Sequence, residues 1–449
     1  MFASSLKLSA TQRIVLSFLI IILTGSILLS LPISQRPGAT ISYWDNLFSA
    51  TSMVCVAGLS IKPISECYSQ VGQTIAMVLI QIGGLSLMSF IGLFALRGGR
   101  KLSFINMSTL QEALSISDTL DFKKFITTIF RYTFWTELLG AFILSFRFVP
   151  QFGLKAGLFN ALFTAVSAFC NAGFDNIGSS SLQAYQTDWL VNGTVALLII
   201  LGGLGFAVWF DLRNQFQLYR TRPKLRFHTK VVLGLTAIIL VCGTLTTLIS
   251  EYHNPATIGN LPFPEKVLSS FFQTVTMRTA GFATIDYTKA NPATLLLYIF
   301  QMMLGGAPGG TAGGIKITAF LTLLLYARSE IRGLPYTNFR HRTIDNTTIR
   351  KAFAVSSIFL GCFLIGLFGL TLTDSKTPFI HLVFETMSAL ATVGVSANLT
   401  PSLSVGGQVV LLFLMFFGRV GPMSFLLSLS RQKKSAKETT HYSKSTMIV

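Results

Sequence analysis

Long apolar runs alternate with short polar segments along nearly the whole chain. A helix needs about 20 apolar residues to cross about 30 Å of hydrocarbon. We predict such helices at residues 14–33, 73–96, 132–150, 189–210, 231–250, 293–326, 352–373 and 406–428. The hydrophobic pattern therefore predicts an all-α polytopic membrane protein with eight transmembrane helices.

A short segment recurs four times, each time between two of these runs. The copies are FSATSMVCVAGL (48–59), FTAVSAFCNAGF (163–174), FQTVTMRTAGF (272–282) and FETMSALATVGV (384–395). Each copy begins with Phe, carries a Ser or Thr part-way along and ends on a small residue, a glycine and an apolar residue, and the third copy is one residue shorter. The recurring glycines are separated by 115, 108 and 113 residues: Gly58, Gly173, Gly281 and Gly394. This nearly constant period indicates one structural unit repeated four times.

Each recurring segment is too short to cross a bilayer and ends in an irregular, glycine-centred stretch. We interpret it as a re-entrant hairpin, in which a short helix enters the membrane and an extended segment leaves it. Irregular backbone at this depth is tolerated only where protein buries it or where it lines a water-filled path. Four hairpins on one axis would surround a central pore with backbone carbonyls, which can replace the hydration shell of a monovalent cation. The alternative interpretation is that the glycines are contact points between helices.

The distribution of charge favours the hairpin interpretation. The chain has 449 residues, 51% of them hydrophobic and 12% charged, with a formal net charge of +18. On a soluble protein that charge would suggest nucleic-acid binding. If each hairpin enters and leaves on one face, 25 of the 35 Lys and Arg residues fall on the opposite face. The positive-inside rule then places both termini in the cytoplasm and the hairpins, with Cys67, on the outer face of the plasma membrane.

The repeats divide the chain into four units and a tail. The units are residues 1–96, 97–212, 213–326, in which the second helix is broken, and 327–430, and the cytoplasmic tail is 431–449. The five cysteines form no C-x-x-C pair, and the five histidines have no metal-ligand spacing. Neither a Ser/His nor a paired-Asp constellation is present, so the chain is predicted to be no enzyme and to hold no organic cofactor.

The sixth apolar run is too long and too rich in glycine to be one helix. Residues 293–326 would span about 51 Å at about 1.5 Å per residue. The sequence GGAPGGTAGG in its middle predicts two half-helices joined by an intramembrane loop, which we interpret as a gate. The loop residues are Gly305, Gly306, Ala307, Pro308, Gly309, Gly310, Thr311, Ala312, Gly313 and Gly314. A passive kink is the alternative, and a phosphate-binding loop is disfavoured because the Gly-Lys-Ser/Thr ending is missing.

Several charged residues fall at membrane depth, where they are costly and usually paired or functional. Arg419 is interpreted as donating hydrogen bonds to loop carbonyls and holding the loop across the pore, with extension to the inner interface as the alternative. Lys316 directly follows the loop and either joins the gate or extends to the interface. Glu137 has two open interpretations, an interface residue or a partner for a neighbouring helix. Arg278 is expected to point behind its hairpin and bind backbone carbonyls.

These motifs together resemble the Trk/Ktr/HKT superfamily of K⁺ transporters, and within it the Ktr-type bacterial membrane subunit. The resemblance covers nearly the whole chain. It implies a homodimer, with one pore per protomer, controlled by a cytosolic octameric ring of nucleotide-binding regulatory subunits of the RCK/KTN type. It also implies a selectivity filter that binds K⁺ through backbone carbonyls, formed by Cys55, Val56, Ala57, Gly58, Cys170, Asn171, Ala172, Gly173, Thr279, Ala280, Gly281, Thr392, Val393 and Gly394.

Two transport functions are compatible with these motifs. The first is K⁺ uptake through a pore driven by membrane potential, with Na⁺ as a second candidate ion. The second is a coupled cation symporter, a class in which broken helices also occur. Symporters usually show inverted repeats, whereas the four units here share one orientation, which favours the pore.

Overall fold

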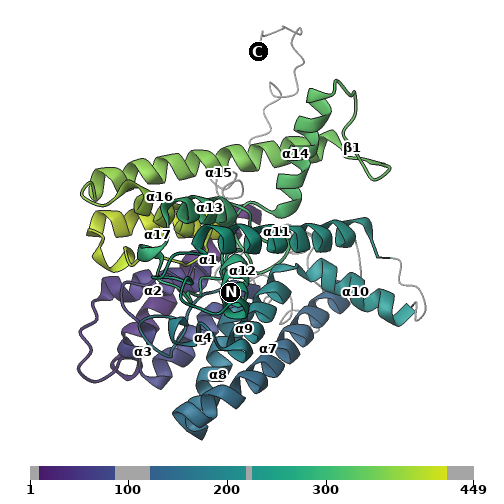
Figure 1. Ribbon diagram of the computed structural model, residues 1–449. Coiled ribbons are helices and arrows are strands. Elements are labelled where there is room, and N and C mark those ends of the chain that lie inside the picture. The colour runs from purple at the N-terminus through teal and green to yellow at the C-terminus, as the bar shows by residue number, and fades with distance from the viewer. Residues whose placement is uncertain (1–9, 86–121, 219–224, 422–449) are drawn as a thin grey trace, which may run out of the picture.

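The computed structural model describes residues 10–85, 122–218 and 225–421, which form a helical molecule (Figure 1). Predictions on the basic segment from Arg97 to Lys101, on the end of the last apolar run and on the tail lie outside the described residues. The helices are α1 (Ala10–Ser30), α2 (Tyr43–Cys55), α3 (Ile64–Cys67), α4 (Gln70–Leu85), α7 (Phe122–Phe152), α8 (Leu154–Phe169), α9 (Trp189–Gly203), α10 (Phe206–Leu218), α11 (Phe227–Glu251), α12 (Phe263–Thr276), α13 (Pro292–Met303), α14 (Ile317–Ile331), α15 (Asn346–Thr373), α16 (Phe379–Leu390) and α17 (Val405–Val420). A small antiparallel hairpin, β1 (Asn338–Phe339) and β2 (Arg342–Thr343), lies between α14 and α15.

Four short helices, α2, α8, α12 and α16, carry the recurring segments. Each packs against the longer helix that precedes it: α1, α7, α11 and α15. The start of α2 is fixed by a capping box, because the Ser42 hydroxyl accepts from the Asp45 N–H while the Asp45 carboxylate accepts from the Ser42 N–H. Every residue of α2 from Phe48 to Cys55 is buried. The recurring segments therefore form the protein's centre.

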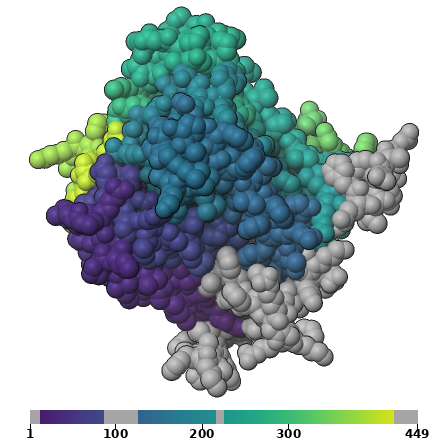
Figure 2. Space-filling view, turned by 90° about the horizontal axis from the view of Figure 1, so that it is seen from below, coloured from purple at the N-terminus to yellow at the C-terminus, as the bar shows by residue number. Residues whose placement is uncertain are grey.

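The helices around the recurring segments are arranged in a closed cycle. The second helix of each unit packs against the short helix of the next, in the pairs α4 with α8, α9 with α12, α13 with α16, and α17 with α2. Figure 2 agrees with this order, since the colours pass from purple through blue to teal and return to purple beside yellow. The last contact joins the end of the described chain to its beginning.

The peripheral helices expose apolar side chains, as expected of a surface that faces lipid. Within the described residues, three helices are long and apolar enough to cross a membrane, namely α1, α11 and α15. The apolar windows of α11 and α15 are only 22% and 17% buried, and Ile249 and Ile365 are 76% and 75% exposed. The chain is therefore a multi-pass membrane protein. The count of eight transmembrane helices stays a prediction, since α4 and α17 reach the limits of the described residues.

The prediction of one continuous helix over residues 189–210 is wrong. Helix α9 ends at Gly203, α10 begins at Phe206, and the two are bent by 92°. Gly205, at the bend, has φ +87°, a left-handed conformation that glycine adopts without the steric cost that other residues incur. Hydropathy does not reveal the break because Leu201–Phe206 is apolar throughout.

The sixth run is divided into α13 and α14. The segment between them forms a loop whose two ends are joined by backbone hydrogen bonds. The Gly305 N–H donates to the Ile315 carbonyl at 2.9 Å, and the Ile315 N–H donates to the Met303 carbonyl at 3.1 Å. Gly305 has to be glycine here, since an added Cβ would lie 1.8 Å from the Gly313 oxygen. We call residues 305–314 the intramembrane loop.

Candidate functional site

The four recurring segments share one backbone conformation after their short helices. The residue two before each glycine is left-handed, with φ between 51° and 66°, and each glycine also has positive φ, between 71° and 97°. The left-handed residues are Val56, Asn171, Thr279 and Thr392. Such φ values are uncommon outside glycine and cluster at functional sites.

One hydrogen bond anchors this conformation in every copy. The N–H of the residue before the glycine donates to the carbonyl of the Ser or Thr part-way along the segment. The distances are 2.8 Å for Ala57 to Ser52, Ala172 to Ser167 and Val393 to Ser388, and 2.9 Å for Ala280 to Thr276. The third copy therefore keeps the same bond although it is one residue shorter.

The four glycines meet in a ring, in sequence order. A Cβ on Gly58 would lie 2.8 Å from the Ala172 oxygen, and one on Gly173 would lie 2.7 Å from the Ala280 oxygen. The cycle closes through Gly281, 2.6 Å from the Val393 oxygen, and Gly394, 2.5 Å from the Ala57 oxygen. No side chain fits at these four positions, and a carbonyl of the neighbouring unit lies against each one.

A cavity of about 180 Å³ lies on one side of the glycine ring. All four ring glycines line this cavity, which we call the vestibule. Its charged lining residues in the described part of the chain are Asp175, Asp286 and Lys62. Burial raises the pKa of Asp175 to about 6, although the Ile177 and Gly178 N–H groups donate to this carboxylate and lower it. The vestibule therefore holds a carboxyl group that titrates near neutral pH, two residues from the ring.

The intramembrane loop lies on the other side of the ring and touches it. The Gly313 N–H donates to the Thr279 hydroxyl at 2.9 Å. A Cβ on Gly313 would lie 2.1 Å from the Thr392 hydroxyl and 2.5 Å from the Ala391 oxygen. Since Thr279 and Thr392 stand two residues before ring glycines, the loop packs directly below the ring.

Arg419, on α17, joins the intramembrane loop to the first unit. Its Nη1 donates to the Thr311 carbonyl at 2.6 Å, and its Nη2 donates to the carbonyls of Gly83 and, at 3.1 Å, Gly84. The expected hydrogen bond between Arg419 and the loop is thus present. Gly83 and Gly84 are new members of this site, and a Cβ on Gly84 would lie 2.6 Å from the Cys170 sulfur.

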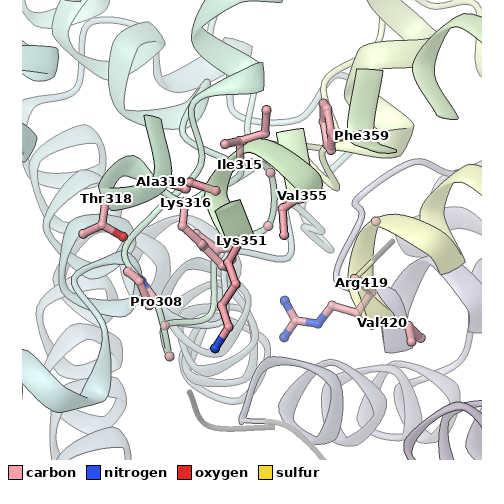
Figure 3. Close-up of a pocket in the computed structure, with 18 of the residues that line it drawn as sticks. Pro308, Ile315, Lys316, Thr318, Ala319, Lys351, Val355, Phe359, Arg419 and Val420 are labelled. Carbon is pink, nitrogen blue, oxygen red and sulfur yellow. The ribbon is translucent and has the colours of Figure 1, made fainter. Parts of the chain in front are cut away.

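A larger cavity of about 700 Å³ lies on the far side of the intramembrane loop. Lys316, Lys351 and Arg419 line it, and no acidic residue of the described chain does. Figure 3 shows Lys351 and Arg419 pointing into this cavity from α15 and α17. Lys316 donates to the Ala312 carbonyl at 2.7 Å, so it is bonded to the loop rather than extended away from it. The vestibule, the ring, the loop and this cavity therefore follow one another in that order.

Two further charged residues lie behind the ring. Glu137 is buried and accepts from the Gln81 side chain at 3.2 Å, while the Cys170 thiol donates to Gln81 at 3.4 Å. Glu137 is thus a partner for a neighbouring helix and not an interface residue. Arg278 is 3% exposed, and its Nε donates to no acceptor in the described residues, so the expected carbonyl contact is not found at that atom.

Glu385 was not predicted from the sequence. It is fully buried on α16, behind the fourth recurring segment, and accepts hydrogen bonds from the hydroxyls of Ser396, at 2.9 Å, and Thr400. An acidic residue inside an apolar segment was the available signal, because a charge at membrane depth usually has a partner or a function. The close spacing of Gly202, Gly203 and Gly205 was a signal for the break in the predicted helix 189–210.

The arrangement can be compared with known proteins. The profile of a family described as TrkH, cation transport protein, matches residues 7–439. This chain belongs to that family. Because the family consists of transporters, the prediction that the chain is not an enzyme is confirmed.

Curated relatives match the TrkH-family chain over nearly its whole length. It is 37% identical over 429 residues to Ktr system potassium uptake protein B of Bacillus subtilis, covering 96% of this chain and 95% of that protein. It is also 37% identical over 446 residues to potassium/sodium uptake protein NtpJ of Enterococcus hirae, covering 99% and 98%. The resemblance to the Trk/Ktr/HKT superfamily that the motifs indicated is therefore confirmed.

A solved structure shares the fold. The crystal structure of the potassium transporter TrkH from Vibrio parahaemolyticus matches with a TM-score of 0.77 over 96% of this chain and 87% of that chain, at 17% sequence identity. The likeness shows that the two chains share a fold.

Proposed function

We propose that this chain is the ion-conducting subunit of a K⁺ uptake system of the Ktr type. One observation carries the proposal: four glycines from four repeated segments meet in a ring, each against a backbone carbonyl of the next unit. Both the curated relatives named above are potassium uptake proteins by name. The substrate of this chain is therefore proposed to be K⁺.

The chemistry of the ring suits a dehydrated monovalent cation. Backbone carbonyls can replace the water molecules around K⁺, and the ring brings the carbonyls of Ala57, Ala172, Ala280 and Val393 together. The four short helices end at this ring, so the negative ends of their dipoles favour a cation there. We propose that the fourteen residues named above by resemblance form the selectivity filter.

The intramembrane loop is proposed to be the gate. It packs directly below the ring, between the ring and the large cavity. Gly-rich backbone has little intrinsic preference for one conformation, so a few hydrogen bonds are enough to hold it. We propose that Arg419 is the latch, because one guanidinium links the loop to α4.

The remaining parts of the proposal concern assembly and energy. We propose that four helix–hairpin–helix units with the boundaries given above surround one pore, and that both termini are cytoplasmic. We further propose a homodimer whose gates are controlled by a cytosolic nucleotide-binding ring, since the Bacillus subtilis relative is named as one component of a system. Membrane potential would drive uptake.

A coupled symporter is the second candidate. The Enterococcus hirae relative is named for both potassium and sodium, which favours a role for Na⁺ either as a second conducted ion or as a coupled one. A pore lets K⁺ move down its own gradient without Na⁺, whereas a symporter moves K⁺ only together with the coupled ion.

Flux into liposomes separates these functions. The purified chain would be reconstituted with K⁺ and Na⁺ gradients set separately, and ⁸⁶Rb⁺ or K⁺ entry measured with and without an imposed potential. We expect K⁺ entry that follows the potential in the absence of Na⁺. Entry that requires a Na⁺ or proton gradient would support the symporter, and no cation entry under any gradient would contradict both.

A further inference from the structure

The break between α9 and α10 is bound by the intramembrane loop through the backbone of both segments. The Ala307 N–H donates to the Gly203 carbonyl at 2.9 Å, and the Thr311 N–H donates to the Gly202 carbonyl at 3.2 Å. In the opposite direction, the Phe206 N–H donates to the Gly309 carbonyl at 3.1 Å. Backbone groups released where a helix breaks must find partners at membrane depth, and here the loop supplies them.

Glycine makes this close approach feasible on both sides. A Cβ on Gly205 would lie 2.7 Å from the Pro308 oxygen, and one on Gly306 would lie 2.8 Å from the Gly203 oxygen. A Cβ on Gly310 would lie 3.1 Å from both the Gly202 oxygen and the Gly205 nitrogen. The two broken segments therefore fit each other as backbone against backbone.

Thr311 is held from three directions by this contact. Its N–H donates to Gly202, its carbonyl accepts from Arg419, and its hydroxyl donates to the Phe169 carbonyl, at 3.2 Å, where α8 ends. The loop is thus anchored by the guanidinium of Arg419, by the broken helix of the second unit and by the Thr279 hydroxyl, which accepts from the Gly313 N–H.

We propose that residues 202–206 form a receptor that holds the intramembrane loop below the glycine ring, so that the gate consists of two broken helices and not one. The proposal rests on the proposed function of the loop as a gate and adds the element that positions it. Opening then requires the three backbone hydrogen bonds to break together, by movement of the loop, of α10, or of both.

The second segment of the receptor is tied to the next unit. Helix α10 starts at Phe206, and further along it the Asp211 carboxylate accepts from the Thr229 hydroxyl at 2.6 Å and from the Arg226 N–H at 3.0 Å, at the start of α11. Displacement of α10 relative to α9 would therefore act on the loop through the Phe206 bond. In a passive helix break, the freed backbone groups would only need hydrogen-bond partners, and movement of α10 would not move the loop.

A reversible cross-link between the loop and the receptor tests the proposal. A Cβ on Gly203 would lie 3.9 Å from the Ala312 Cβ, within the range of about 3.5–4.5 Å that disulfides require. Gly203 is suited to replacement because the nearest atom to this Cβ is 3.6 Å away. The full-length Gly203→Cys, Ala312→Cys variant would be reconstituted in liposomes, and K⁺ entry measured after oxidation and again after reduction.

We expect oxidation to lower K⁺ entry at least about tenfold and reduction to restore it. The matched control is Gly193→Cys with Ala312→Cys, since Gly193 lies on the same helix α9 with open space around its Cβ. Linked peptides identified by mass spectrometry establish that the bond has formed. Unchanged entry in the linked protein, or a failure of the two cysteines to link in the folded protein, would overturn the proposal.

A second variant tests the opposite direction. Gly205→Ala introduces a Cβ that the loop does not accommodate, so K⁺ entry without a regulatory partner should rise about tenfold, equivalent to about 1.4 kcal/mol, with K⁺ over Na⁺ preference unchanged. Gly193→Ala should behave as wild type. If loop deletion raises K⁺ entry while Gly205→Ala and the cross-link have no effect, the loop is a gate but residues 202–206 are not its receptor. If wild type conducts no K⁺, the proposed function itself fails.

Discussion

Glycine satisfies two separate requirements at each ring position. Positive φ between 71° and 97° favours it, and the approach of a neighbouring carbonyl to 2.5–2.8 Å of the absent Cβ excludes every other residue. The recurrence of Gly58, Gly173, Gly281 and Gly394 could therefore be predicted from the sequence as a functional pattern.

The left-handed residues two positions earlier could not be predicted. Val56 and the threonines at 279 and 392 are β-branched and avoid this region, which costs of order 1–3 kcal/mol per residue. The conformation persists because the surrounding backbone fixes it, including the bond to the Ser or Thr carbonyl. The local preference of these residues is for other backbone conformations, so the left-handed conformation is seen only in the packed structure.

Asp175 gives the vestibule a pH dependence at the scale of one residue. Its pKa of about 6 means that the carboxyl is charged at pH 7 and mostly neutral at pH 5. Loss of one negative charge in the vestibule weakens the attraction for a cation by on the order of 0.5 kcal/mol in water. We expect the half-saturating K⁺ concentration to rise about twofold to threefold from pH 7 to pH 5.

The matched variant is Asp175→Asn, which removes the titrating group from the vestibule. Its half-saturating K⁺ concentration should stay at the elevated value at both pH values, as measured by initial uptake rates. An unaltered pH dependence in Asp175→Asn would assign the effect to another group.

At the scale of elements, the break within residues 293–326 was predicted from the sequence, and the break between α9 and α10 was not. GGAPGGTAGG interrupts residues 293–326 with so many glycines and a proline that a helix is excluded. The break at Gly205 lies among Leu201, Leu204 and Phe206, so hydropathy alone does not reveal it, although three of the six residues 201–206 are glycine. Its cause is the binding of a segment about 100 residues away in sequence, which local patterns do not encode.

The loop and its latch lead to a prediction about gating. A hydrogen bond from a charged donor contributes about 1.5–3 kcal/mol, which corresponds to roughly a tenfold to hundredfold bias toward the closed state. Arg419→Ala, or deletion of residues 306–313, should therefore raise K⁺ entry in the absence of a regulatory partner. The increase in Arg419→Ala should be the smaller of the two, because the receptor on α9 and α10 remains.

Ion preference serves as the internal control for both gate variants, because the ring is a separate element. Their K⁺ over Na⁺ preference should match that of wild type. A correctly inserted deletion variant with wild-type flux would identify the loop as a kink.

At the scale of the whole molecule, the cycle of units follows from contacts that no single repeat encodes. The pairing of α17 with α2 closes the cycle across more than 300 residues of sequence. The period of the motif predicts four units in sequence order, and the contacts of the short helices agree with that order. The α17–α2 contact that closes the cycle could not be predicted from one repeat, since it depends on how all the repeats pack together.

Thiol labelling of intact cells tests the proposed orientation. The sequence predicts that Cys67, on the outer face, reacts with an impermeant thiol reagent added outside. This prediction is wrong, since Cys67 is 7% exposed and its carbonyl is bonded to the Arg36 N–H in a packed turn. Single cysteines in place of Ser180, which is exposed beside the vestibule, and Tyr336, 67% exposed between α14 and α15, are better reporters. With Cys242 and Cys362 replaced by Ser, an impermeant reagent outside should label only the cysteine at 180. Labelling of a cysteine at position 336 from outside would contradict the proposed orientation.

The central claim is that the glycine ring selects the ion. The most direct measurement is the ratio of K⁺ to Na⁺ entry into liposomes for wild type and for Gly58→Ser, Gly173→Ser and Gly281→Ser. Gly178→Ser is the matched control, because Gly178 lines the same vestibule with nothing within 4 Å of its Cβ. The account predicts that the ratio falls in each ring variant and persists in the control, whereas an unchanged ratio in all three ring variants would contradict it.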